Sequence, residues 1–136
     1  MNRRELFKQL NSLCKELDYR YNINSGGCCF IAAVISEQLE IYNIPHTIIY
    51  YNLYGCHYAI RVKDRIINRC DYKIKEIVSD KFISSVDLYF TYNNEYWNKT
   101  YNKKHNPIIK RKIKSLFKKY ENRGKRFCNG RCSSRQ

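Results

Sequence analysis

The sequence contains few acidic residues and no long hydrophobic run. Only 12 of its 136 residues are Asp or Glu, against 26 Lys and Arg. Its longest apolar stretches, around Ile31 and Ile48, are much shorter than the roughly 20 residues that a transmembrane helix needs. No apolar segment follows the start at Met1 to Arg4, so the pattern of a secretory signal peptide is also missing. We therefore expect a soluble or peripheral protein without a transmembrane segment.

Glycine and proline are scarce as well, with five Gly and two Pro. Together with abundant Asn, Ile, Lys and Tyr, this is typical of an AT-rich coding sequence and points to a phage or an AT-rich bacterium. The seven Cys form an odd set without the dense, regular spacing of a secreted disulfide scaffold. These features predict an intracellular protein in a reducing compartment, in the host cytoplasm, or in the virion if the protein is phage-encoded.

The composition is that of one folded domain. Apolar residues make up 43% of the chain and aromatic residues 15%, which excludes the disordered class. A chain of this length holds one hydrophobic core of ordinary size. Charge is uneven, because Lys103 to Gln136 holds 13 Lys or Arg and one acid, Glu121, and so contributes +12 of the formal net charge of +14. We therefore expect a domain over residues 1–102 and a basic C-terminal helix and tail over residues 103–136.

Hydrophobic periodicity predicts two helices in the first third of the chain. Apolar residues recur at helical spacing between Arg4 and Tyr21. The segment from Cys28 to Tyr42 contains neither Pro nor Gly, and its apolar content predicts a buried helix that ends before Pro45.

Three runs rich in Ile and Tyr predict a small antiparallel meander with a turn at Lys63 and Asp64. Beyond the meander, helical or irregular packing fits residues 74–97, and Tyr89 to Tyr92 also fits a strand. After Pro107 the apolar residues follow one face of a predicted helix otherwise covered in Lys and Arg. The three predicted strands are Thr47 to Tyr54, Cys56 to Val62 and Arg65 to Cys70.

The candidate chemistry begins at a Gly-Gly pair that leads into the second predicted helix. Gly26 and Gly27 precede Cys28, which places this thiol at or near a helix N-terminus. The positive end of the helix dipole favours the thiolate, the reactive form of cysteine. The backbone N–H groups there are suited to stabilise an oxyanion. Cys29 is the alternative nucleophile if the helix begins one residue later.

His57 supplies the proton-transfer partner that a thiolate nucleophile requires. It lies in the second predicted strand, two residues after Gly55. The third predicted strand contains Asn68, whose side-chain carbonyl is suited to accept the second imidazole N–H and hold the ring in its useful tautomer. Asp71 is the substitute for this orienting role.

This order, Gly-Gly-Cys on a helix, Gly-x-His on a strand and Ile-Ile-Asn on the next strand, resembles the papain-like cysteine peptidase and transglutaminase-like superfamily. It looks most like small phage-encoded papain-like proteins. The resemblance covers Ser25 to Asp71 and implies a papain-like α+β fold, with N-terminal helices packed on a small antiparallel sheet. It also implies Cys28 as nucleophile, His57 as base and Asn68 as the third member.

The resemblance implies acyl-thioester chemistry and leaves the reaction open. Papain-like enzymes often use an upstream Gln as an oxyanion donor, and Asn22 or Asn24 would have to replace it here. The fold supports hydrolysis and acyl transfer, and it also includes members that have lost catalysis. We expect a cysteine-dependent hydrolase or acyltransferase acting on a peptide or protein. The alternative is an inactive papain-like scaffold in a nucleic-acid-associated phage or virion protein.

The other histidines and a C-terminal cysteine pair are weaker candidates. His46 follows Pro45 in a predicted loop and His105 lies in the basic segment, so both are expected to face solvent. Cys128 and Cys132 have a spacing seen among zinc ligands, but no His or second close Cys pair accompanies them. We therefore expect neither a metal site nor a cofactor.

The basic segment is a candidate surface for polyanions. Its cations and interspersed aromatic residues are suited to contact nucleic-acid phosphates and bases without sequence preference. An acidic protein partner or an anionic membrane surface fits the same features. The predicted nucleic-acid-binding residues are Lys110, Arg111, Lys112, Lys114, Lys118, Lys119, Arg123, Lys125 and Arg126.

Overall fold

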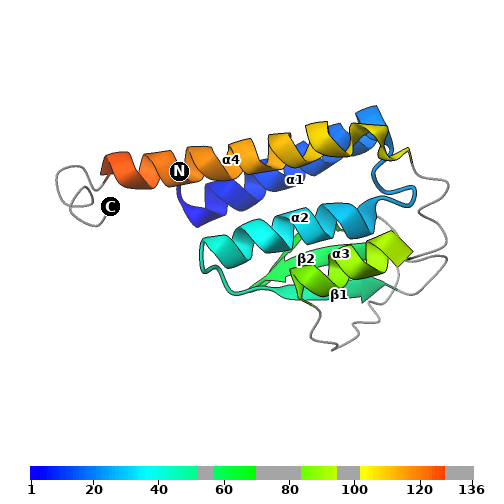
Figure 1. The fold of residues 1–136 in the computed structure, drawn as a ribbon. Coiled ribbons are helices and arrows are strands. Elements are labelled where there is room, and N and C mark those ends of the chain that lie inside the picture. The colour runs from blue at the N-terminus through cyan, green and yellow to red at the C-terminus, as the bar shows by residue number, and fades with distance from the viewer. Residues whose placement is uncertain (52–56, 70–83, 95–101, 128–136) are drawn as a thin grey trace.

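A computed structural model describes residues 1–51, 57–69, 84–94 and 102–127, with side chains up to residue 121 in the last range. These residues form four α-helices, a short 3-10 helix and a three-stranded antiparallel sheet, so the expected α+β class is confirmed (Figure 1). The helices are α1 (Arg3–Tyr21), α2 (Cys28–Ile41), α3 (Ser85–Asn94), η2 (Lys103–His105) and α4 (Asn106–Phe127); the strands are β1 (Thr47–Tyr51), β2 (His57–Val62) and β3 (Arg65–Ile67).

Helix α2 is the centre of the fold. Almost all of its side chains are buried, because it packs against β2, α3 and α4. A helix that is apolar on all sides is stable only when other elements surround it. In Figure 1 it lies between the α1–α4 pair and the layer formed by the sheet and α3. The predicted buried helix that ends before Pro45 is confirmed, with Ile41 as its last residue.

Helices α1 and α4 lie side by side and run in opposite directions (Figure 1). The apolar stripe of α4 enters the same core as that of α1, through Ile109, Ile113 and Phe117. Burying one such side chain stabilises the fold by roughly 1.5–3 kcal/mol, so a few of them hold this otherwise polar helix in place. The basic helix predicted after Pro107 therefore shares one core with residues 1–102.

The sheet has the predicted meander order, β1-β2-β3, with antiparallel pairing throughout. Tyr51 at the end of β1 pairs with His57 at the start of β2. Lys63 and Asp64 form the predicted turn between β2 and β3, with Lys63 at φ 57°. Strand β2 is mostly buried because it is the middle strand and α2 packs against it.

Helix α3 corrects one prediction, because Tyr89 to Tyr92 are helical and not a strand. The helix start is marked by Ser84 and Asp87. The Asp87 carboxylate accepts the Ser84 backbone N–H at 3.0 Å, and the Ser84 hydroxyl accepts the Asp87 N–H at 3.2 Å, as in a capping box. Leu88 and Tyr92, four residues apart, are buried in the core that surrounds α2. This cap and this packing outweigh the strand preference of the aromatic residues.

Candidate active site

The loop before α2 is anchored at several points, and this defines where the helix begins. Ile23 is fully buried. The backbone N–H of Asn24 donates to the Asp18 carboxylate at 2.9 Å. Gly26 has φ 104°, a conformation that favours glycine because it has no Cβ. The helix then starts at Cys28, so the prediction of a cysteine at a helix N-terminus is confirmed.

Cys28 combines a helix N-terminus with deep burial. No side chain caps the helix, because Gly27 occupies the capping position, and the positive end of the helix dipole lies at this turn. Cys28 is present as a thiol, and the residue is only 1% exposed within the hydrophobic core. Burial opposes ionisation of a thiol. A thiolate here therefore depends on the helix end and on a neighbouring cation such as a protonated histidine.

His57, the first residue of β2, is oriented by a backbone carbonyl. Its Nε2 atom lies 2.7 Å from the carbonyl oxygen of Asn68. Because a carbonyl oxygen only accepts hydrogen bonds, Nε2 carries the proton, and Nδ1 is the basic nitrogen of the neutral ring. The sequence predicted that the Asn68 side chain would orient the ring. The structure places Asn68 beside His57 but uses its backbone carbonyl instead.

The side chain of Asn68 is paired with a different residue. Its amide exchanges two hydrogen bonds with the amide of Asn24, at 3.3 and 3.1 Å. Its backbone N–H donates to the side-chain oxygen of Asn11 at 2.9 Å, and the Asn11 amide donates to the Ile66 carbonyl at 3.3 Å. These bonds hold Asn68 in the left-handed region at φ 60°. We call Asn11, Asn24 and Asn68 the asparagine clamp.

The asparagine clamp connects the two halves of the candidate site. Asn24 lies four residues before Cys28, and Asn68 holds the imidazole of His57. Helix α2 packs against β2, and both begin at the same end of the molecule, on the right in Figure 1. The sequence suggested Asn24 only as an oxyanion donor and missed Asn11. The one signal for Asn11 was its low helix propensity inside a predicted helix.

Cys29 is also buried, and its contact joins two helices. The Cys29 thiol donates to the backbone carbonyl of Leu88 at 3.3 Å, which links α2 to α3. Its residue is 0% exposed. The alternative nucleophile therefore has a structural contact on α3, whereas Cys28 is the residue at the first helical position.

A polar cavity of about 350 Å³ borders the asparagine clamp, with Asp18 and Arg69 also in its lining. Neither Cys28 nor His57 lines this cavity, and His57 is 9% exposed. Covalent chemistry requires contact between the reacting atoms. A substrate would therefore reach the thiol only after the surrounding chain moves.

His46 was predicted to face solvent, and this prediction is wrong. Its residue is half-buried, with Nδ1 2.9 Å from the Ile44 carbonyl oxygen and Nε2 2.7 Å from the Ser36 hydroxyl. Ser36 is fully buried, and its hydroxyl also donates to the Glu40 carboxylate at 3.2 Å. The same carboxylate accepts the backbone N–H of Ser85 at 3.2 Å. A buried hydroxyl requires hydrogen-bond partners, and this requirement turns the imidazole inward.

His105 is likewise half-buried rather than fully exposed. Its ring centroid lies 4.5 Å from that of Tyr21, so the 3-10 helix before α4 contacts the end of α1. Its ring contact indicates a packing role.

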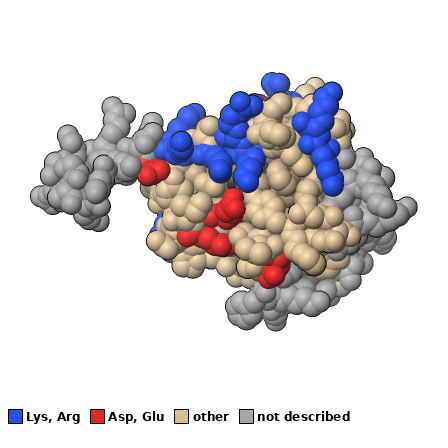
Figure 2. Space-filling model, in the orientation of Figure 1, with Lys and Arg blue, Asp and Glu red and all other residues tan. Residues whose placement is uncertain are grey.

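The predicted cations of α4 fall into two groups. Lys110 lies 4.0 Å from a Glu37 oxygen, and Lys112 lies 3.7 Å from a Glu16 oxygen. The other described members are exposed and have no carboxylate within 4 Å in the described part of the chain. Figure 2 shows Lys and Arg gathered along the upper edge of the molecule, where α4 lies, with acidic residues below. The exposed group comprises Arg111, Lys114, Lys118 and Lys119.

Several residues singled out in the sequence lie outside the described residues. They are Gly55, Asp71, Cys128 and Cys132, together with the side chains of Arg123, Lys125 and Arg126. Within the described ranges, no helix has the length and apolar character required to cross a membrane. Comparison of the chain with protein-family models, curated proteins and solved structures found no match.

Proposed function

We propose that this protein is a cysteine-dependent hydrolase or acyltransferase of the papain-like type, acting on a peptide or protein. Cys28 is the nucleophile and His57 the base. The observation that carries the proposal is the 2.7 Å contact between His57 Nε2 and the Asn68 carbonyl. It leaves Nδ1 as the basic nitrogen of a ring at the start of β2, next to the helix that Cys28 begins.

The reaction follows from these two groups. Nδ1 of His57 takes the Cys28 proton, and the thiolate attacks a substrate carbonyl carbon to give a tetrahedral oxyanion. The imidazolium returns its proton to the leaving amine as the carbon–nitrogen bond breaks, which leaves a thioester on Cys28. Water or a second amine then attacks the thioester, His57 removes its proton, and the thiol is restored. Water gives hydrolysis, and an amine gives acyl transfer.

The first test is the pH dependence of Cys28 alkylation, measured by mass mapping of iodoacetamide labelling. Coupling to His57 predicts labelling of Cys28 with a midpoint below about pH 8.5, the value for a free cysteine, and loss of this reactivity in His57→Ala. Cys29 provides an internal reference because it lies on the same helix. Its alkylation rate measures how often the start of α2 becomes accessible to the reagent.

His46→Ala is the matched control, since it removes another histidine whose ring makes two hydrogen bonds. It should leave the ratio of Cys28 to Cys29 labelling unchanged. If Cys28 is labelled no faster than Cys14 at neutral pH, or if His57→Ala leaves the profile intact, the proposed thiol chemistry is wrong. Cys14 is a suitable inert standard, because burial and then the nearby Asp18 carboxylate raise its pKa to about 12.

A second candidate function is nucleic-acid binding on a scaffold that lacks catalysis. The observation that favours it is the exposed group of α4 cations without carboxylate partners in the described part of the chain. Phosphate contacts of this kind are insensitive to sequence and weaken steeply with salt. Binding of unrelated oligonucleotides with equal affinity, reduced in Lys114→Glu/Lys118→Glu, would support this function. Salt-independent binding, or none at low salt, would contradict it.

A further inference from the structure

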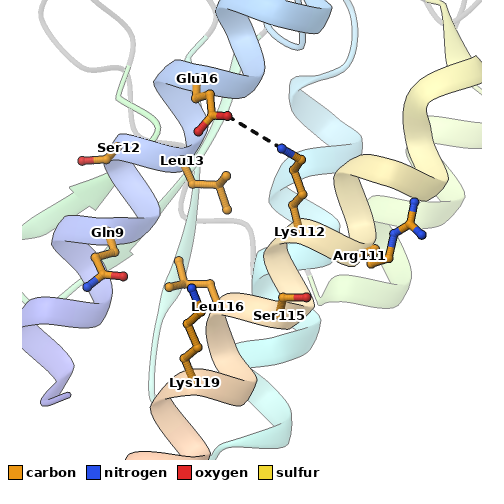
Figure 3. Close-up of a pocket in the computed structure, with 9 residues that line it drawn as sticks. All are labelled: Gln9, Ser12, Leu13, Glu16, Arg111, Lys112, Ser115, Leu116 and Lys119. Atoms are coloured by element: carbon orange, nitrogen blue, oxygen red, sulfur yellow. Dashed lines mark ion pairs between the residues drawn. The ribbon is translucent and has the colours of Figure 1, made fainter.

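A groove of about 510 Å³ lies between helices α1 and α4, on the face of this helix pair that is turned away from α2 (Figure 3). Leu13 of α1 and Leu116 of α4 point toward each other across it, as Figure 3 shows. Leu13 is half-buried and Leu116 is 7% exposed. The groove therefore has an apolar floor between two helices, a shape that accepts the apolar face of a third helix.

The rim of the groove is positively charged. Arg111, Lys112 and Lys119 line it on α4, and Glu16 lines it on α1. The Glu16 carboxylate already pairs with Lys112 at 3.7 Å and with Arg20 at 3.4 Å. Arg111 and Lys119 have no carboxylate within 4 Å among the described residues. An occupant of the groove would therefore meet two cations that lack acidic partners.

The spacing of these cations fits a short helical segment. Arg111 and Lys119 are eight residues apart on α4, which corresponds to about 12 Å along the helix axis. An amphipathic helix presents apolar side chains at i, i+3, i+4 and i+7 over about the same distance. Acidic residues beside that apolar stripe would lie near Arg111 and Lys119 while the apolar residues contact Leu13 and Leu116.

Nucleic acid fits the groove less well than an acidic protein helix. A phosphate backbone gains nothing from a leucine floor, whereas the apolar face of a helix gains free energy by burying it. It would bind more strongly to cations that project freely, and Lys114 and Lys118 do not line the groove. We propose that the α1–α4 groove binds an acidic, amphipathic helical segment of another protein. The inference does not depend on the thiol chemistry of Cys28.

The test uses fluorescence anisotropy with the full chain and a labelled peptide of roughly 18 residues, long enough to form a helix. Leu occupies one face at i, i+3, i+4 and i+7, and Glu occupies the flanks. A scrambled peptide of identical composition has no apolar face. A single-stranded oligonucleotide of roughly 20 nucleotides serves as the competing polyanion.

Two double variants with equal charge change separate the groove from the rest of α4. Arg111→Glu/Lys119→Glu reverses the cations in the groove, and Lys114→Glu/Lys118→Glu reverses exposed cations outside it. We expect the first to weaken the patterned peptide about tenfold or more and the second about twofold or less. Leu13→Gln, which keeps helix propensity, should weaken the peptide about fivefold and leave oligonucleotide binding unchanged. Thermal unfolding followed by circular dichroism confirms that each variant is folded.

Any of four results would overturn the proposal. The first is equal binding of the patterned and scrambled peptides, and the second is equal weakening of the peptide by the two charge-reversal variants. The third is no binding of the peptide together with oligonucleotide binding that depends on Arg111 and Lys119. The first two would show unspecific attraction to the basic helix, and the third would assign the groove to nucleic acid. Absence of peptide binding at concentrations near 1 mM, the weakest affinity of interest, would also refute it.

Discussion

Replacing Asn68 by Gly and by Ala should separate the role of its backbone carbonyl from that of its side chain. Both variants lose the two hydrogen bonds between the side-chain amides of residues 68 and 24. Because Asn24 is exposed, each of these bonds contributes roughly 1 kcal/mol or less to the free energy of unfolding. Glycine adopts φ 60° without steric cost, whereas alanine pays roughly 1–2 kcal/mol for the left-handed conformation. Only the alanine variant should therefore move the carbonyl away from His57.

The magnitude follows from that conformational difference. One or two kcal/mol changes a population by a factor of roughly 5 to 30. If the carbonyl orients His57, Asn68→Gly should keep the ratio of Cys28 to Cys29 alkylation within about twofold of wild type, and Asn68→Ala should lower it by roughly 5 to 30 times. The ratio cancels any difference in how often α2 opens, because both thiols lie on that helix.

The assay is mass mapping of alkylation as a function of pH, with urea unfolding of each variant to measure stability. Equal loss of reactivity in both variants would show that the side-chain amide, not the carbonyl, orients the imidazole. Wild-type ratios in both variants would show that the Asn68 contact does not influence the thiol at all.

Three further predictions concern stability. Burial raises the pKa of Cys14 from 9.0 to about 12. The contribution of the protonated thiol to the free energy of unfolding is therefore complete below pH 9 and is lost as pH rises toward 12. At about pH 10 the free energy of unfolding should be lower by about 1.4 kcal/mol. Urea unfolding at several pH values should show this fall in the free energy of unfolding for wild type and not for Cys14→Ala. An equal fall in both proteins would refute the prediction. Ser36→Ala should lower the free energy of unfolding in urea by roughly 1–3 kcal/mol, because it leaves the His46 ring without a buried partner. Ser12→Ala, at an exposed position, is the control and should change the free energy of unfolding by less than about 0.5 kcal/mol. Glu16→Gln removes two surface ion pairs and should cost less than about 1 kcal/mol; a larger loss that persists in high salt would contradict this.

The structure gives the proposed thiol chemistry a specific requirement. Cys28 is 1% exposed, so the proposed reaction needs an opening of the chain around it as well as a basic His57. The asparagine clamp positions the Asn68 carbonyl that contacts His57. Its hydrogen bonds join α1, the loop before α2 and the end of β3, so three segments hold one carbonyl in place.

The two proposed sites lie on different parts of the fold. The proposed active site uses the start of α2 and the start of β2, whereas the groove uses the outer sides of α1 and α4. A helix bound in the groove would therefore not compete with a substrate at Cys28.

Local patterns in the sequence were sufficient for most of the elements. The apolar spacing of α1 and α4, the break at Gly26 and the turn at Lys63 depend on residues close together in the chain, so their physical basis is visible locally. The position of Cys28 at a helix N-terminus follows for the same reason. Helix α3 was ambiguous because its Tyr-rich segment also suits a strand, and packing of Leu88 and Tyr92 into the core around α2 decided the outcome.

Tertiary structure alone decided which atoms meet at the candidate site. The sequence predicted that His57 and Asn68 lie on neighbouring strands, but β3 ends at Ile67 and Asn68 follows it in a left-handed conformation. A backbone carbonyl there takes the role that was expected of the Asn68 side-chain amide. That choice depends on Asn11, which is 57 residues away from Asn68 in the chain, and on the left-handed backbone that its hydrogen bond helps to hold. The inward turn of His46 and the groove between α1 and α4 have the same origin, because each depends on contacts between segments that only folding brings together.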